Sequence, residues 1–182
     1  LTPPSLRMLL SWSGGKDAAL AYDALLDDGA HVDSLLVTVD EGTDRVGMHG
    51  VPLALVEAQA ASLGVPLSVM RVPRFPSNAA YEKALAAALA PWRARGVTMV
   101  AYGDLFLEEV RTFRDAVLGR HGMEARYPLW GRDTGTLARE AVAAGWRATL
   151  CVVDSRVLGP EWSGRPWDAA LLDALPRDVD PC

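Results

Sequence analysis

The sequence is short of several residue types, and each shortage limits what the protein can be. Its two cysteines, Cys151 and Cys182, lie too far apart to indicate a disulfide framework or a cysteine-based metal site. No apolar run approaches the roughly 20 residues that a membrane-spanning helix needs. The first residues lack the basic start and apolar block of a secretory signal peptide. We therefore expect a cytoplasmic protein with no membrane partner.

Lysine is scarce, although arginine is abundant. The chain has two lysines, Lys16 and Lys83, against sixteen arginines, and its net charge is -5. An acidic balance argues against broad nucleic-acid binding, so we expect no nucleic-acid partner. A chain of 182 residues that is 50% hydrophobic can bury one good core. One of the two lysines lies in the most informative segment of the chain.

That segment is residues 13–17, Ser-Gly-Gly-Lys-Asp, which join a short apolar run to an Ala/Leu-rich helical run. Two glycines let the backbone approach an anion closely, and a helix start offers N–H groups and a positive dipole end. The spacing is neither that of a Walker A loop nor that of a dinucleotide fingerprint. It resembles the pyrophosphate loop (PP-loop) of the ATP pyrophosphatases, in the adenine nucleotide alpha hydrolase group. The alternative is a plain strand-to-helix turn capped by Ser13 or Asp17.

Strand-like and helical runs alternate along the chain. The expected strands are residues 8–12, 34–39, 67–72, 98–102 and 148–153, with a further short strand at 124–127. The expected helices are residues 16–28, 52–63, 78–95, 105–120 and 134–144. This alternation predicts the α/β class, a Rossmann-like five-stranded parallel sheet with helices on both faces. Ligands bind beyond the carboxyl ends of such strands, so we expect one shared rim of Ser13, Asp40, Arg74, Gly103 and Asp154.

Later segments extend the resemblance to a family. They are residues 41–52, Tyr102-Gly103-Asp104 with Leu107-Glu108 and Arg111, residues 127–130, and residues 158–168. Together they look like the diphthine–ammonia ligase family and its shorter bacterial relatives. The resemblance implies a HUP-type fold and an enzyme that uses ATP and Mg²⁺ to convert a carboxylate into an acyl adenylate, with release of pyrophosphate. Ammonia then displaces AMP and leaves an amide.

The resemblance also implies an organisation and partners. Residues 1–155 would form the ATP-binding domain, and residues 156–182 would begin an acceptor-binding region that continues beyond Cys182 in the native chain. The expected partners are ATP, ammonia and a carboxylate, either a small molecule or a modified protein side chain. A homodimer is one possible assembly. Ala18 stands where the family usually has a serine, which removes one hydroxyl contact to phosphate.

The turn chemistry and the resemblance together give a candidate site. The expected catalytic residues are Lys16, Asp17, Asp104, Glu108 and Arg111, with Asp17 and Asp104 as Mg²⁺ ligands. The expected ATP-binding residues are Ser13, Gly14, Gly15, Lys16, Val39, Met48, His49, Gly50 and Gly103, with the Met48 thioether and the His49 imidazole bracketing adenine. Pro128, Leu129 and Trp130 are expected to line the acceptor pocket.

Ordinary structural roles stay open for several of these residues. His49 could cap the next helix, and Asp104 could be the N-cap of a helix that starts at Leu105. Glu108 and Arg111 could belong to a solvated, salt-bridged helix face, and Trp130 could be core. Two rival function classes also remain: another PP-loop chemistry such as thiolation, and a non-catalytic ATP sensor of the universal-stress-protein type.

Overall fold

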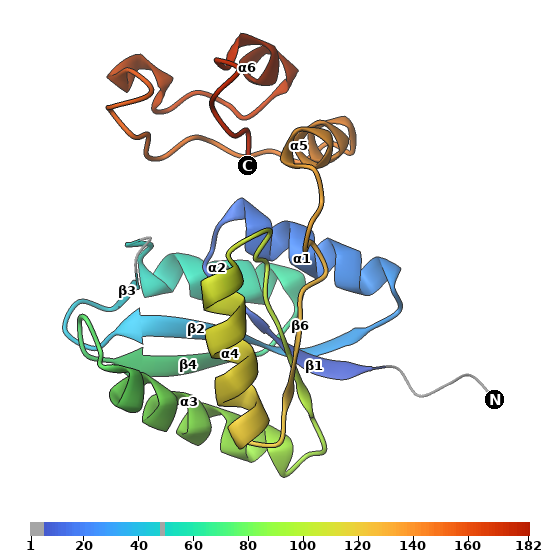
Figure 1. Ribbon diagram of the computed structural model, residues 1–182, viewed down its shortest axis with the longest axis vertical. Coiled ribbons are helices and arrows are strands. Elements are labelled where there is room, and N and C mark those ends of the chain that lie inside the picture. The colour runs from blue at the N-terminus through green and yellow to red at the C-terminus, as the bar shows by residue number, and fades with distance from the viewer. Residues whose placement is uncertain (1–5, 48–49) are drawn as a thin grey trace. The chain divides into compact units, whose positions relative to one another are not determined.

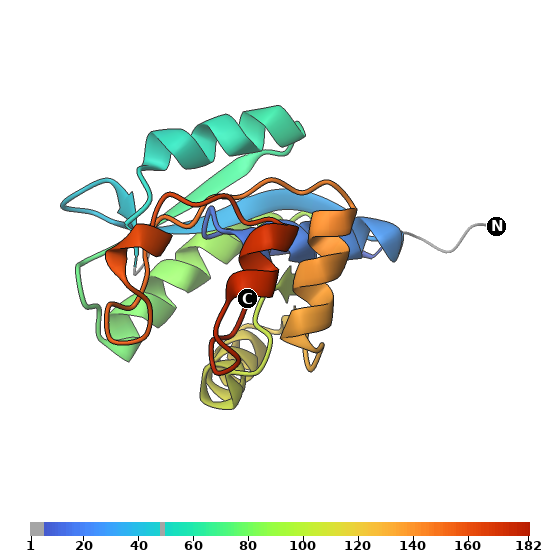
Figure 2. The ribbon, with the colours of Figure 1, turned by 90° about the horizontal axis from the view of Figure 1, so that it is seen from above.

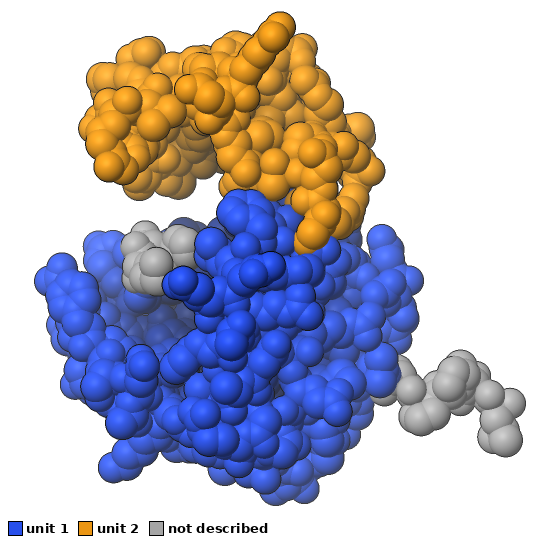
Figure 3. All heavy atoms as spheres, in the orientation of Figure 1, with its two compact units in different colours: residues 1–130 blue, residues 131–182 orange. Residues whose placement is uncertain are grey.

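The chain folds into two compact units, which Figure 3 distinguishes by colour. The computed structural model describes residues 6–47 and 50–182, so the predictions for Met48 and His49 lie outside the described residues. Unit 1 is Leu1–Trp130 and unit 2 is Gly131–Cys182. Each unit has its own core and is described by itself.

Unit 1 is built from strands that alternate with helices. Its elements are β1 (Arg7–Ser11), α1 (Lys16–Asp27), β2 (His31–Asp40), β3 (Arg45–Val46), α2 (Leu53–Leu63), β4 (Leu67–Val72), α3 (Asn78–Arg93), β5 (Met99–Ala101), α4 (Glu108–Arg120) and β6 (Glu124–Arg126). Five strands pair in parallel in the spatial order β4-β2-β1-β5-β6, and the short β3 pairs antiparallel with β2. After β1, the strands β2 and β4 are added on one side of it, and β5 and β6 are then added on its other side. The order in which strands are added therefore reverses between β1 and β5. This reversal is the topological switch point at which sheets of this kind bind ligands.

Helices cover both faces of the sheet. Leu9 and Leu36 join one core with Leu85 of α3 and Val117 of α4. Leu10 is also buried, and it points to the opposite face because successive strand residues alternate. The helices α1 and α2 lie on that second face, and α3 and α4 lie on the first, as right-handed crossovers require (Figures 1 and 2). These three layers confirm the predicted Rossmann-like α/β class.

The prediction of a strand at residues 148–153 was wrong. These residues, all described, form no strand, and one isolated bridge joins Thr149 to Pro166. The short β6 instead occupies the fifth parallel position, beside β5. Asp154 consequently belongs to unit 2 and does not follow a strand of the sheet. The two compact units divide after Trp130. The expectation of an ATP-binding domain over residues 1–155 stays a prediction.

Unit 2 contains α5 (Thr134–Ala143), the 3₁₀ turn η1 (Pro160–Trp162) and α6 (Ala169–Ala174). Aspartates start both α-helices: Asp133 accepts from the Thr136 amide and Asp168 accepts from the Leu171 amide, each satisfying an N–H that the helix leaves unpaired. Trp167 is buried, and its indole N–H donates to the Pro181 carbonyl at 3.0 Å, which ties the tail to this unit. Of the helices in the described residues, none has the length and apolar character to cross a membrane.

Candidate nucleotide site

The glycine turn links the carboxyl end of β1 to the start of α1. Gly14 has φ +81°, a left-handed conformation that favours glycine. Gly15 is the N-cap of α1, and no side chain caps the helix, which rules out Ser13 or Asp17 in that role. The Ser13 hydroxyl instead accepts a 3.3 Å hydrogen bond from the Gly15 amide. The start of α1 is thus built from backbone N–H groups, with the Ser13 hydroxyl as acceptor for the Gly15 N–H, and helix starts of this kind bind anions.

Charged side chains follow directly in the first turn of α1. The Lys16 ammonium lies 2.7 Å from a carboxylate oxygen of Asp17. The Lys16 side chain is 23% exposed and that of Asp17 is 41% exposed. Both groups therefore reach solvent at the switch point, where a phosphate chain and its counterion would lie.

Gly103 brings the end of β5 against the same turn. A Cβ on this residue would lie 2.7 Å from the carbonyl oxygen of Asp17 and 3.1 Å from the amide nitrogen of Ala18. Only glycine fits such a close approach to the backbone, so the two strands that flank the switch point are held together at the loop. The structure thus brings the predicted Gly103 against the first turn of α1. The other predicted residues at this place are the consecutive Ser13, Gly14, Gly15 and Lys16.

Asp104 is held by an arginine. One of its carboxylate oxygens pairs with Arg114 of α4, whose guanidinium carbon lies 4.1 Å from the ring centre of the buried Tyr102. The helix α4 begins at Glu108, with Leu107 as N-cap, so the predicted start at Leu105 was wrong and Asp104 does not cap it. Burial raises the pKa of the Tyr102 phenol well above its ordinary value. Asp104 itself is partly buried, and the positive charge of Arg114 compensates its negative charge.

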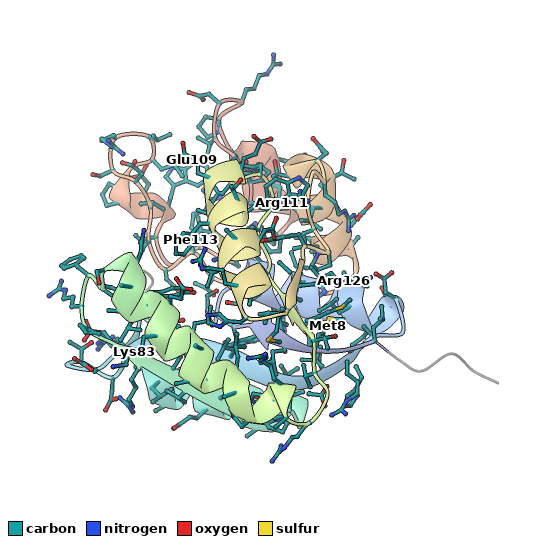
Figure 4. All side chains as sticks on the ribbon, turned by 60° about the horizontal axis from the view of Figure 1, so that its bottom comes forward. Met8, Lys83, Glu109, Arg111, Phe113 and Arg126 are labelled. Carbon is teal, nitrogen blue, oxygen red and sulfur yellow. The ribbon has the colours of Figure 1, made fainter. Side chains whose placement is uncertain are left out.

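Arg111 contacts aromatic rings. Its guanidinium carbon lies 5.0 Å from the ring centre of Tyr127 and 4.5 Å from that of Trp130, within the range of cation–π attraction. Tyr127 stacks on Tyr102 with 5.7 Å between ring centres. Figure 4 labels Arg111 on α4. Glu108, one turn earlier on this helix, is exposed.

The phenol of Tyr127 is a fixed donor beside Arg111. Its hydroxyl donates to a carboxylate oxygen of Asp115 at 2.9 Å. Burial first, and then this hydrogen bond, raise the pKa of Tyr127. The phenol therefore stays protonated at neutral pH.

The residues expected to line the acceptor pocket differ in their exposure. Leu129 has no exposed area, so its side chain is not available to a ligand. Pro128 and Trp130 are half-buried and lie beside it in a turn. Of the three, these two keep surface that a ligand could contact.

The expected adenine region lies around the ends of β2 and β3. Val39 is fully buried and pairs with Val46 of β3, so a ligand could reach its backbone but not its side chain. Gly50 has φ +64° and is exposed, and its carbonyl accepts a 2.6 Å hydrogen bond from Arg45. The Gly50 amide also donates to the Val46 carbonyl at 2.9 Å, so both backbone groups of Gly50 bond to residues of β3.

Gln59 of α2 was not predicted as a site residue. Its side-chain oxygen accepts from the Trp12 indole N–H at 2.9 Å, and its amide nitrogen donates to the Gly14 carbonyl at 3.1 Å. Nothing in the local sequence marks this glutamine, because both partners lie more than forty positions away.

The residues at this rim fit a nucleotide-bound metal better than a resident one. Within residues 6–47 and 50–182 no three acidic, histidine or cysteine side chains gather as a metal site. Mg²⁺ that accompanies ATP takes most of its ligands from phosphates and water and only one or two from carboxylates. Both candidate carboxylates already pair with a cation, Asp17 with Lys16 and Asp104 with Arg114. Asp17 fits the role better because its side chain is 41% exposed, against 14% for Asp104.

Comparison with known proteins identifies the family. No curated protein matches the chain significantly. The family model described as "Diphthamide synthase N-terminal domain" matches residues 6–125, more than half of the chain. That segment contains the glycine turn, Gln59, Gly103, Asp104 and Arg111. The chain therefore belongs to the diphthamide synthase N-terminal domain family, an ATP-using family of the PP-loop ATP pyrophosphatase type.

Proposed function

We propose that the protein is an amide-forming ligase that cleaves ATP to AMP and pyrophosphate. The observation that carries the proposal is the close approach of Gly103 to the first turn of α1, which follows Gly14 and Gly15 directly and starts without a side-chain cap. A loop of backbone N–H groups holds phosphate without accepting a phosphoryl group. In this proposal the β and γ phosphates lie at the loop and leave as pyrophosphate.

The loop would act by stabilising the charge of the leaving group. Backbone N–H groups are already oriented, so they need no reorganisation as negative charge accumulates on pyrophosphate. Lys16 adds a positive charge at the helix start, and Asp17 would contribute a ligand to ATP-bound Mg²⁺. Bound Mg²⁺ would neutralise phosphate charge and polarise the phosphoryl oxygens. Adenine would lie near the backbone of Val39, with Met48, His49 and Gly50 around it.

The carboxylate acceptor would attack the α-phosphate and form an acyl adenylate. We propose that Arg111 and Glu108 of α4, with Pro128 and Trp130, meet the acceptor on its way to this point. A guanidinium beside aromatic rings can pair with a carboxylate while it keeps its cation–π contacts. Ammonia would then attack the acyl carbon and expel AMP, with Asp104 proposed to orient the reacting groups.

Incubation with α-labelled ATP, ammonium and a panel of carboxylates tests this function. We expect label in AMP, an equal amount of pyrophosphate, and an amide product, with Lys16→Ala as the inactive control. Label in ADP would refute the proposal, because a loop that binds the β and γ phosphates as a leaving group releases them together. Bound ATP that stays intact with every carboxylate would favour the sensor class.

A further inference from the structure

The Gly14–Gly15 peptide is the part of the loop that most needs an external restraint. A peptide between two glycines rotates with little steric cost, because neither residue has a Cβ to block other φ and ψ values. Gly14 is held at φ +81° and Gly15 at φ −94°. Rotation of this one peptide plane would turn the Gly15 N–H away from its present direction.

Gln59 supplies the restraint from α2. Its amide nitrogen donates to the Gly14 carbonyl at 3.1 Å, and its oxygen accepts from the Trp12 indole at 2.9 Å. Trp12 is only 4% exposed, so the glutamine amide is anchored by a buried donor and its two ends cannot exchange. Gln59 and Val56 also pack against Gly14: a Cβ on this glycine would lie 3.3 Å from the Gln59 oxygen and 3.4 Å from Val56.

The planarity of the peptide bond carries this restraint to the anion site. In a trans peptide the C=O and the next N–H point in opposite directions. A Gly14 carbonyl held toward α2 therefore turns the Gly15 N–H away from α2. The Ser13 hydroxyl accepts this N–H at 3.3 Å, a long bond that a phosphate oxygen could replace.

We propose that Gln59 is a positioning residue, which fixes the Gly14–Gly15 peptide so that the Gly15 N–H is presented to a phosphate group. Gln59 itself need not contact the nucleotide. The inference rests on the proposed binding of ATP phosphates at the loop, and it adds a residue of α2 to a site otherwise formed by β1, α1 and β5.

Two variants separate the bonds of Gln59. Gln59→Met keeps the length and helix propensity of the side chain but removes both hydrogen bonds. Gln59→Glu keeps an acceptor for Trp12 and removes the donor to Gly14. Glu57→Met is the matched control, because Glu57 is an exposed residue of the same helix. If Gln59→Met fails to fold, Gln59→Glu still tests the donor.

Titration of the intact chain with ATP and with adenosine, followed by ¹⁵N–¹H NMR, gives the decisive measurement. We expect both Gln59 variants to bind ATP about 5- to 10-fold more weakly, the usual effect of losing one such bond, with adenosine binding unchanged. The Gly15 amide signal should shift or double in the absence of ligand. Glu57→Met should match the unsubstituted protein in all three readouts.

The outcomes distinguish this inference from the proposed function. Equal ATP affinity in the unsubstituted protein and both Gln59 variants would overturn the positioning role alone. An equal loss of ATP and adenosine affinity would also overturn it, because it would indicate general damage to the fold. An unsubstituted protein that binds no ATP would refute the proposed function, and the inference with it.

Discussion

Replacement of Gly103 by alanine perturbs the contact between β5 and the first turn of α1. The added methyl group would lie 2.7 Å from the Asp17 carbonyl oxygen and 2.8 Å from its carbonyl carbon. Favourable contacts between carbon atoms lie near 3.5 Å, so the backbone has to move by about 0.7 Å. The obstructing atoms belong to the main chain and cannot rotate aside. Overpacking of this kind costs about 1–3 kcal/mol.

Thermal unfolding measures this cost directly. We expect Gly103→Ala to lower the Tm by roughly 2–12 °C, since 1 kcal/mol corresponds to about 2–4 °C for a chain of this size. Gly119→Ala is the control: this helical glycine of α4 has nothing within 4 Å of a built Cβ, so alanine should stabilise the helix by up to about 1 kcal/mol. Equal Tm values for the two variants would refute the close-approach argument. Because the displaced turn is the proposed phosphate site, Gly103→Ala should also weaken ATP binding in calorimetry.

Three further predictions concern charge. Lys16→Ala should weaken ATP binding in calorimetry at least about tenfold, since it removes the positive charge from the glycine turn, and unchanged affinity would contradict the phosphate site. Arg114→Met should lower the free energy of unfolding by about 2–4 kcal/mol, because it leaves Asp104 partly buried without its partner. In urea titrations the double variant with Asp104→Asn should recover stability, and no recovery would contradict an ion pair between these two residues. Hydrogen bonds from Thr136 lower the pKa of Asp133 below 3.8, so the carboxylate stabilises α5 above pH 3.8 and this stabilisation is lost as the pH falls through the lowered pKa. Asp133→Ala should therefore flatten the dependence of stability on acid pH. An unaltered acid unfolding curve would exclude this cap.

Local sequence patterns were sufficient to predict the centre of unit 1. The central strands β1, β2 and β5 were predictable because they are largely buried and read as short apolar runs. The outer strand β4 alternates toward its end between exposed and buried residues, a pattern that also predicts a strand. The glycine turn was predictable for a related reason: its chemistry depends on consecutive residues. At the edge of the sheet, β6 confirms the further short strand expected at residues 124–127, although Glu-Ala-Arg carries little apolar signal. The more apolar residues 148–153 were wrongly predicted to be a strand, because an apolar run alone does not report whether a segment pairs with the sheet.

Long-range contacts account for the residues that sequence reasoning missed or misassigned. Gln59 reads as an ordinary helical position until the fold brings Trp12 and Gly14 beside it. The sequence suggests that Asp104 is the N-cap of a helix. In the structure that helix, α4, begins only at Glu108, and Asp104 pairs instead with Arg114 within it. Such partners depend on how α2 and α4 pack, and no local spacing reports that packing.

The central place of β1 has a consequence for how unit 1 folds. This strand comes first in the chain, yet Met8 pairs in register with Met99 of β5. One side of β1 therefore stays without its partner strand until nearly the whole unit has been synthesised. Contacts between residues so distant in sequence slow folding, because a long loop has to close before they stabilise anything. The nascent chain would thus carry an exposed, apolar strand edge through most of its translation, and the nucleotide site would form among the last features of the unit.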